Sequence, residues 1–265
     1  MSLHIEIHGH GPTQLVLIHG WAMHGGVFAP LVEALADACT MHVVDLPGHG
    51  YSRDSELALE PQACARAITA RTPPAVWLGW SLGGLVALTA ALDFPQQVTA
   101  LAMLCATPKF VRDASWPYGS DPTLIRQLAV DLETDYHATI ERFLALEAMG
   151  SADPRAELRR LRAEVFARGE PDPRVLQEGI GLLERSDLRD ALPRLVQPSQ
   201  WIAGRRDRLV PPPAMAWSAA HSGDGQSGAF AQIDHAGHAP FIGHADALAR
   251  ALQPLLQPAT IDARP

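Results

Sequence analysis

The sequence predicts an α/β fold: one domain with a mostly parallel sheet, helices on both faces, and a helical lid inserted into it. Two observations carry this prediction. Short apolar segments alternate with helical stretches near both ends of the chain, and residues 108–192 interrupt that alternation. Several segments are apolar throughout, as strands of a parallel sheet buried on both faces must be. With 265 residues, 47% of them hydrophobic, the chain can bury a core without a metal or a disulfide.

Strands are expected where short apolar runs lie between turn residues. These runs are 3–7, 15–19, 41–45, 76–79, 101–105, 200–203 and 230–233. Helices are expected where apolar positions recur with a helical period, at 28–38, 82–93 and 245–256. Pro95 ends the second helix, because proline cannot continue the hydrogen-bond ladder.

Between residues 108 and 192 the sequence is helical and rich in Arg and Glu, with turn residues at 116–122, 150–154 and 169–173. Such an insertion into an α/β sheet is typical of a lid. We therefore expect a discontinuous core of residues 1–107 and 193–258, a lid of residues 108–192 and a flexible tail of residues 259–265. A second domain with its own core is the alternative for the insertion.

The net charge of −8 argues against nucleic acid and against an anionic membrane surface as partners. Cys39, Cys64 and Cys105 are odd in number and scattered, so we expect neither disulfides nor a metal, and a cytoplasmic setting. The first residues lack the basic start and apolar run of a secretory signal. The uncharged stretch 73–92 is long enough to span a membrane, but glycines and a serine interrupt it, which favours a strand, a turn and a helix.

That stretch contains the motif Gly79-Trp80-Ser81-Leu82-Gly83, a G-x-S-x-G directly after a strand and directly before a helix. In this context the serine lies on a strained turn that exposes its hydroxyl at the carboxyl edge of the sheet. The motif alone is common by chance, and a glycine-rich turn with an incidental serine is the alternative. The context makes Ser81 the candidate nucleophile.

A serine nucleophile needs a general base, because its hydroxyl is not ionised at neutral pH. In hydrolases with this elbow, an acid and then a histidine follow the serine in the chain. Asp207 ends a strand and enters a loop, and two histidines, His235 and His238, follow the last strand. We favour His238, which lies deeper in the loop and beside the next helix, with Asp207 holding its tautomer. The other candidate acids, none of which ends a strand before a loop, are Asp187, Asp190 and Asp234.

The oxyanion of an acyl-transfer intermediate needs two N–H donors. One candidate is the backbone N–H of Leu82 at the start of the helix. The other is that of Trp21, because the strand at 15–19 runs into His19-Gly20-Trp21. Ordinary core packing is the alternative role for Trp21. The loop around Gly48 and Gly50 lacks a complete dinucleotide motif, and no histidine cluster resembles a metal site, so we expect no cofactor and no metal.

Together these motifs resemble the α/β-hydrolase superfamily over nearly the whole chain. The resemblance is closer still to the family of carboxylesterases that act on the methyl ester of pimeloyl-acyl carrier protein in biotin synthesis. The stretches that carry it are Leu17-Ile18-His19-Gly20-Trp21, Val44-Asp45-Leu46-Pro47-Gly48, Trp77-Leu78-Gly79-Trp80-Ser81-Leu82-Gly83-Gly84-Leu85-Val86, Glu141-Arg142-Phe143-Leu144-Ala145-Leu146 and His238-Ala239-Pro240-Phe241. The elbow with its tryptophans and the lid stretch are the most specific.

The resemblance implies a cytoplasmic, monomeric serine esterase that releases methanol from this ester, with acyl carrier protein as its partner. It also implies a substrate site lined by Trp21, Leu82, Phe143, Leu144, Ala145, Leu146, Glu147 and His238. Glu147 departs from the neutral Gln of the family, and a carboxylate there would change contacts with the ester end. Other hydrolases remain alternatives: a broad short-chain esterase, a C–C hydrolase or a serine peptidase. A ligand sensor that retains the triad is an alternative from another class.

The lid also carries a basic stretch. Asp153 and Pro154 predict a helix start, and residues 155–168 hold five Arg against two Glu. An acidic carrier protein would suit such a patch, because Arg pairs well with carboxylate and phosphate. The candidate docking residues are Arg142, Arg155, Arg159 and Arg162. A solvated helix face is the alternative.

Overall fold

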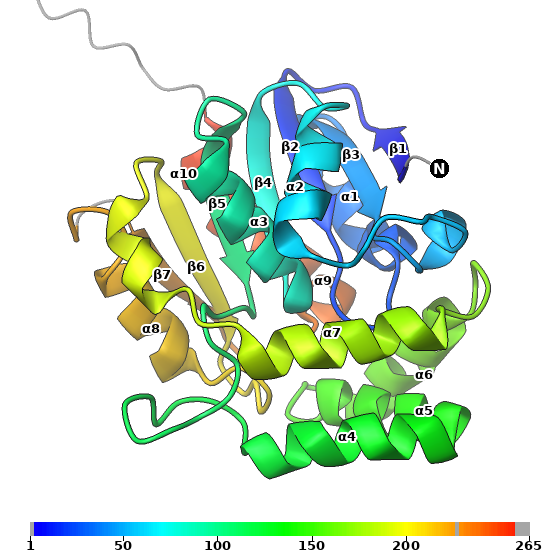
Figure 1. The fold of residues 1–265 in the computed structure, drawn as a ribbon. Helices are drawn as coiled ribbons and strands as arrows, with labels where there is room; N and C mark the ends of the chain where they lie inside the picture. Colours follow the sequence, from blue (N-terminus) through cyan, green and yellow to red (C-terminus); the bar gives the residue numbers. More distant parts are fainter. Residues whose placement is uncertain (1–2, 226–227, 258–265) are drawn as a thin grey trace, which may run out of the picture.

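The computed structural model describes residues 3–225 and 228–257, whose centre is a seven-stranded sheet in the order β1-β3-β2-β4-β5-β6-β7 (Figure 1). β1 pairs antiparallel with β3, and every other pairing is parallel. The strands are β1 His4–His8, β2 Thr13–Ile18, β3 Cys39–Asp45, β4 Ala75–Trp80, β5 Val98–Leu104, β6 Ser199–Gly204 and β7 Gly228–Ile233. All seven expected strands are therefore present, with ends shifted by at most three residues.

Helices cover both faces of the sheet (Figure 1). The helices outside the insertion are α1 Ala29–Leu35, α2 Pro61–Thr69, α3 Leu82–Asp93, α8 Pro212–Ala220, α9 Pro240–Gly243 and α10 Ala245–Leu256. α2 packs on α3, and α1 packs on α10. β4 and β6 are buried along their whole length, as central strands between two helical layers must be, whereas the edge strands β1 and β7 are partly exposed.

Two helix predictions match the structure and one needs correction. The helices expected at 82–93 and 245–256 are α3 and α10. The helix expected at 28–38 is shorter: a 3₁₀ turn, η1 Gly25–Phe28, leads into α1, which ends at Leu35. Just beyond its end, the carbonyl of Ala36 accepts a hydrogen bond from the N–H of His10 in the turn between β1 and β2. The tail expected at 259–265 lies outside the described residues.

Four helices of the insertion lie across the carboxyl ends of the parallel strands (Figure 1). They are α4 Pro122–Thr134, α5 Tyr136–Ala148, α6 Pro154–Val165 and α7 Pro173–Arg185, and the 3₁₀ turn η3 Arg189–Arg194 leads back to β6. Each begins at an aspartate whose carboxylate accepts a backbone N–H of the first turn, which defines the helix starts. These capping residues are Asp121, Asp135, Asp153 and Asp172.

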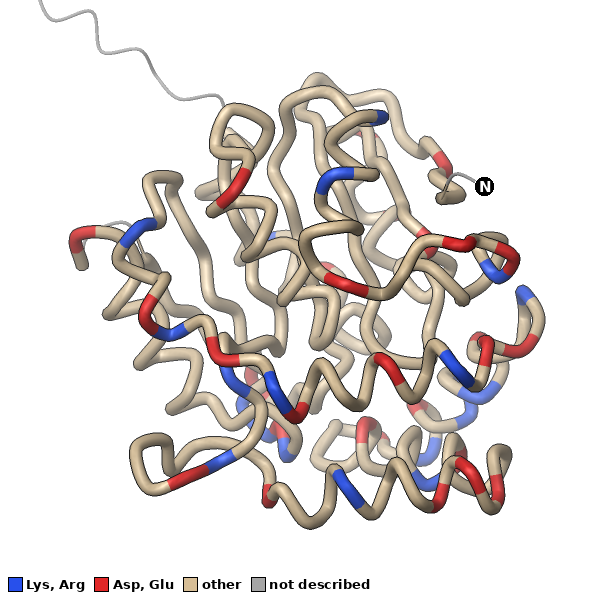
Figure 2. The backbone as a smooth tube through the Cα atoms, viewed as in Figure 1, with Lys and Arg blue, Asp and Glu red and all other residues tan. Residues whose placement is uncertain are grey.

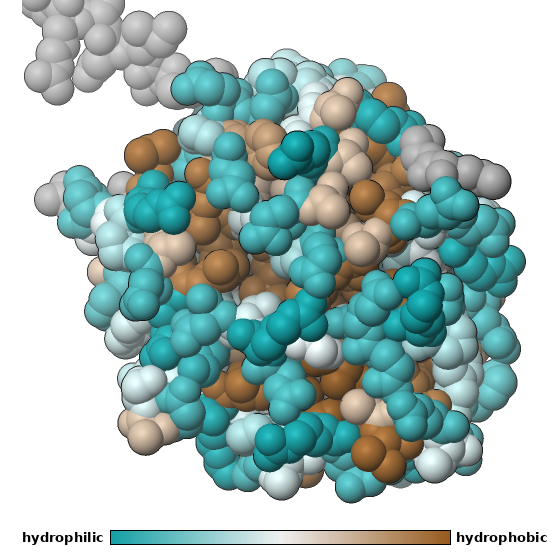
Figure 3. Space-filling view, in the orientation of Figure 1, coloured by the Kyte–Doolittle hydropathy of each residue, from teal (hydrophilic) through white to brown (hydrophobic). Residues whose placement is uncertain are grey.

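Charge and hydropathy separate the sheet from the lid. In Figure 2 the strands are almost free of charged residues, whereas both signs of charge intermingle along the lid helices. On the face shown in Figure 3, apolar side chains are visible between α4 and α7 among polar ones. The uncharged stretch 73–92 forms β4, the turn at Ser81 and most of α3, and within residues 3–225 and 228–257 no helix is long and apolar enough to cross a membrane.

Candidate active site

Ser81 occupies a sharp turn between β4 and α3. Its backbone lies at φ 53° and ψ −122°, in the left-handed half of φ space that side chains rarely adopt. Gly83 allows α3 to start this close to the sheet, because a Cβ there would lie 2.4 Å from the carbonyl oxygen of His19. The turn therefore holds the Ser81 hydroxyl at the carboxyl edge of the sheet, as the motif predicts.

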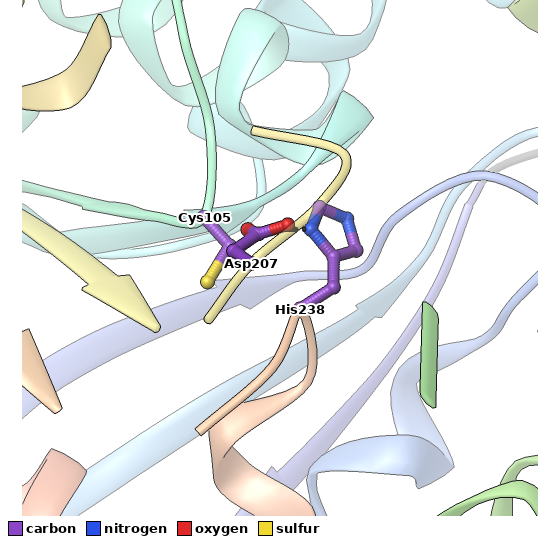
Figure 4. A group of neighbouring side chains, drawn as sticks. All are labelled: Cys105, Asp207 and His238. Atoms are coloured by element: carbon purple, nitrogen blue, oxygen red, sulfur yellow. Dashed lines mark hydrogen bonds and ion pairs between the residues drawn. The ribbon is translucent and has the colours of Figure 1, made fainter. Parts of the chain in front are cut away.

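Three side chains from distant parts of the chain form one hydrogen-bonded line. His238 Nε2 lies 2.9 Å from Ser81 Oγ, and its Nδ1 lies 2.8 Å from a carboxylate oxygen of Asp207. Figure 4 shows the contact between Asp207 and His238. All three are buried, at 5% exposure for Ser81, 6% for Asp207 and 1% for His238. The structure thus brings together the three residues proposed as nucleophile, base and acid.

Neighbouring groups fix the acid and the base. The second carboxylate oxygen of Asp207 accepts the N–H groups of Leu209 and Val210, at 2.8 Å and 3.0 Å. The indole N–H of Trp80 donates to the carbonyl oxygen of His238 at 2.8 Å. The loop that follows β7 is therefore tied directly to the residue before the nucleophile.

The two candidate oxyanion donors lie on either side of Ser81. Leu82 is the first residue of α3, so its N–H has no acceptor within the helix. The N–H of Trp21 has no acceptor among the residues that the structure describes. Gly20 lets its loop approach the nucleophile, because a Cβ there would lie 3.1 Å from the Cβ of Ser81. The loop that carries Trp21 therefore passes next to Ser81.

The other candidate bases and acids lie elsewhere. His235 is exposed, with a φ of 61°, and Asp234 beside it pairs with Arg205 on the surface. Asp187 pairs with Lys109 and Arg189, and Asp190 belongs to the turn η3. None of them reaches the hydroxyl of Ser81.

A small apolar cavity of about 30 Å³ lies next to Ser81 and His238. Lid and core both line it, through Phe110, Ile125, Phe143, Leu183, Leu209 and Val210, with Ser120 as a polar member. A water molecule needs about 10–15 Å³ of such space. The space next to Ser81 in this structure is therefore smaller than a long acyl chain.

Of the lid stretch expected to line the substrate site, the structure brings only Phe143 to this cavity. Its ring packs edge-on against Trp21, with centroids 4.6 Å apart. Ala145 and Leu146 are exposed on the other side of α5, and Leu144 and Glu147 are buried outside the cavity lining. The helical period explains this, since successive residues point to different faces.

The expected docking arginines differ in whether a carboxylate already pairs with them. Arg142 pairs with Asp131 at 2.9 Å, and Arg162 pairs with Glu141 at 2.5 Å. Arg155 and Arg159 are exposed on α6 and have no ion pair with any described residue. Arg168, counted in the basic stretch, instead turns inward, where it pairs with Asp45 and Glu6.

One group of described residues has three potential metal-ligating atoms close together. Cys105 Sγ, a carboxylate oxygen of Asp207 and a ring nitrogen of His238 lie within 4.8 Å of one another (Figure 4). Burial raises the pKa of the Cys105 thiol well above its usual value, which keeps it protonated. Because His238 and Asp207 already share a hydrogen bond, this group fits the acid end of the triad better than a metal site.

The sequence comparisons agree with this geometry. The sequence pattern of the alpha/beta hydrolase fold family matches residues 13–245. The chain is 57% identical to the pimeloyl-[acyl-carrier protein] methyl ester esterase of Xanthomonas oryzae pv. oryzae (strain MAFF 311018), over 95% of this chain and 97% of that protein. It is also 57% identical to the esterase of the same name from Stenotrophomonas maltophilia (strain R551-3), over 95% of each chain.

Solved structures share the fold at low sequence identity. A bromoperoxidase from Bacillus anthracis superposes with a TM-score of 0.84 at 21% identity, and it covers 96% of this chain and 95% of its own. An esterase from Exiguobacterium antarcticum gives a TM-score of 0.83 at 18% identity, with the same coverage. At these identities the match concerns architecture alone.

Proposed function

This chain belongs to the α/β-hydrolase family, and on that premise we propose that it hydrolyses the methyl ester of pimeloyl-acyl carrier protein to pimeloyl-acyl carrier protein and methanol, in biotin synthesis. It is a carboxylic ester hydrolase. The observation that carries the proposal is the hydrogen-bonded line of Asp207, His238 and Ser81. The high identity to esterases of that name, over nearly their whole length, supports the choice of substrate.

In the first half-reaction, Ser81 Oγ attacks the ester carbonyl carbon while His238 Nε2 takes the hydroxyl proton. Asp207 holds the ring orientation and stabilises the imidazolium. The N–H groups of Trp21 and Leu82 donate to the oxyanion of the tetrahedral intermediate. The intermediate collapses by breaking the bond to the methoxy oxygen, which takes the proton from His238 and leaves as methanol.

The second half-reaction uses the same groups on water. His238 takes a proton from a water molecule, whose oxygen attacks the acyl carbon on Ser81. The bond to Oγ breaks, and the proton on His238 returns to the serine. The product is a free carboxyl group at the end of a chain that remains attached to its carrier.

We place the carrier protein against the lid, because Arg155 and Arg159 are exposed there without acidic partners among the described residues. All three triad members come from one chain, so one copy carries the complete triad, and we propose a monomer. Cys39, Cys64 and Cys105 are free thiols, in keeping with a cytoplasmic enzyme.

The test compares the carrier-linked methyl ester with p-nitrophenyl acetate, for the wild type and for Ser81→Ala. We expect the wild type to turn over both esters and the variant to lose on the order of 10⁶ in kcat, as in a serine-hydrolase precedent. More than a few per cent residual activity, with contaminating esterase excluded, would contradict Ser81 as nucleophile. Turnover of the small ester without methanol release from the carrier-linked one would contradict the substrate.

A further inference from the structure

Two glutamates of the lid lie buried near the triad acid without a positive partner. Glu147 on α5 is fully buried, and Glu157 on α6 is 6% exposed. Among the described residues, neither carboxylate oxygen of Glu147 has a hydrogen-bond partner, nor does one oxygen of Glu157. An ionised carboxylate in such a place loses its hydration and gains nothing in return.

Burial and the acidic neighbours of this pair favour its neutral form, while Asp153, Arg160 and His244 line the same surface pocket as Glu157. Burial, and then the charges of Glu157 and Asp207, raise the pKa of Glu147 well above its usual value. Burial and Asp207 raise the pKa of Glu157 to about 7. Ser151 lies close enough to lower that pKa in part, yet its hydroxyl makes no hydrogen bond of normal geometry. Cys105, at the end of β5, is itself kept neutral by burial.

The same part of the lid touches the two loops that carry the acid and the base. The carbonyl oxygen of Glu147 accepts the backbone N–H of His238 at 3.4 Å. A Cβ on Gly237 would lie 3.2 Å from the carbonyl oxygen of Met149, and one on Gly150 would lie 2.3 Å from that of Arg206. Residues 147–151 therefore sit in direct backbone contact with the chain beside both Asp207 and His238.

We propose that Glu147 and Glu157 are positioning residues. As neutral acids they hold residues 147–151 against the loops that carry Asp207 and His238. When they lose their protons to solvent, this segment moves away from those loops and His238 is no longer aligned with Ser81. The proposal rests on the proposed function only in taking Ser81, Asp207 and His238 as the triad.

The pair has a definite effect on the pH dependence of stability. In the unfolded chain both glutamates ionise near their ordinary pKa of 4.5, whereas in the folded enzyme they keep their protons to higher pH. The folded state then binds more protons than the unfolded state, so stability falls as pH rises from that value through the folded pKa values. For Glu157 this window ends at about pH 7, and for Glu147 it likewise begins at the ordinary pKa and runs upward, because burial raises that pKa well above 4.5.

The test uses Glu147→Gln and Glu157→Gln, which keep the shape and remove the ionisation. The matched control is Glu133→Gln, the same change at an exposed position of α4 in the same lid. Two quantities are measured from about pH 6 to about pH 9: the melting temperature, and the rate at which a fluorophosphonate labels Ser81. The labelling rate measures triad alignment without any assumption about the natural ester.

We expect wild type and Glu133→Gln to lose melting temperature with rising pH more steeply than Glu147→Gln and Glu157→Gln. The ratio of the wild-type labelling rate to that of Glu147→Gln should fall with rising pH. Above the pKa of Glu147 in the folded enzyme, it should fall by up to about tenfold for each pH unit. Parallel curves for all four proteins would overturn the proposal. The proposal would also be overturned if the melting temperature of the Gln variants changed less with pH while the labelling ratio stayed constant. The pair would then stabilise the lid without positioning His238. Normal labelling without hydrolysis of the carrier-linked ester would leave this proposal standing and contradict the proposed function.

Discussion

The acid and the base of the candidate triad are each held by neighbouring groups as well as by each other. One carboxylate oxygen of Asp207 is hydrogen-bonded to His238, and the other accepts two backbone N–H groups of its own loop. His238 is held through its backbone by the indole of Trp80 and by the lid at Glu147. Rigid support of this kind keeps reacting groups within hydrogen-bond reach, which is the geometry that proton transfer requires.

The two histidines after β7 give a direct test at this scale. His238→Ala should reduce kcat nearly as much as Ser81→Ala, because nucleophile and base act as a unit. His235→Ala should keep most of its kcat, since this side chain is exposed and makes no contact with Ser81. Steady-state kinetics on p-nitrophenyl acetate compare the two variants. The opposite order of effects would make His235 the base.

The candidate triad could be proposed from the sequence because each member follows a strand that the sequence marks clearly. Ser81 lies in a motif, and Asp207 and His238 come in the expected order at the ends of their strands. Glu157 could not be found in this way. Its approach to Asp207 depends on how α6 packs on the core, and nothing in the spacing of two residues so far apart encodes that packing.

At the scale of elements, one inward-facing side chain of the lid pairs with acidic residues on two strands of the sheet. Arg168 follows α6, and its guanidinium reaches Asp45 at the end of β3 and Glu6 on β1. Asp45 is fully buried and also accepts the N–H groups of Gly25 and Tyr51. Arg168 therefore supplies the only positive charge that pairs with this carboxylate among the described residues.

Arg168→Ala should lower the free energy of unfolding by about 1–3 kcal/mol, the cost of leaving a buried polar group without its partner. Arg174→Ala is the matched control, because Arg174 is an exposed lid arginine whose ion pair with Glu178 on α7 is worth only about 0.2–0.5 kcal/mol. Urea unfolding monitored by circular dichroism measures both. Equal losses would show that the ion pair to Asp45 adds nothing to the lid's attachment.

The elements themselves were predictable where their pattern is long or uniform. α3 and α10 each run for twelve residues, and the strands are short apolar runs. α2 and α8 were not predicted. α2 has nine residues, too few for a helical period to stand out, and α8 is rich in alanine, so no polar face marks it.

At the scale of the whole molecule, the net charge of −8 opposes the approach of an acidic carrier protein. Long-range repulsion of this kind slows association unless a local positive surface faces the partner. Arg155 and Arg159 on α6 supply such a surface, whereas Arg142 and Arg162 are already neutralised by neighbouring carboxylates. The proposed docking surface is therefore smaller than the basic stretch in the sequence suggests.

Reversing Arg155 and Arg159 to Glu should reduce kcat/KM on the carrier-linked ester and leave p-nitrophenyl acetate nearly unaffected, since only the carrier touches this surface. For the wild type, kcat/KM on the carrier substrate should fall with added salt, as the Debye length shortens from about 10 Å at 0.1 M to about 3 Å at 1 M. Stopped assays of both substrates against salt concentration give these values.

The control reverses Arg66 on α2 and Arg250 on α10, two exposed arginines outside the lid, and so changes the net charge equally. If this control loses as much activity on the carrier substrate, overall charge and not a docking surface sets the rate. If the change at Arg155 and Arg159 lowers kcat/KM equally for both substrates, α6 matters for lid packing instead.

The long separation between Ser81 and His238 also has a consequence during protein synthesis. A growing chain completes β4 and the nucleophile turn early, but Asp207 and His238 are added only after the entire lid. Asp207 and His238 follow the last two strands. A nascent chain that ends before them therefore has neither the acid nor the base that would activate Ser81. The proposed triad is therefore complete only after the whole lid has been synthesised, so we expect an unfinished chain to lack esterase activity.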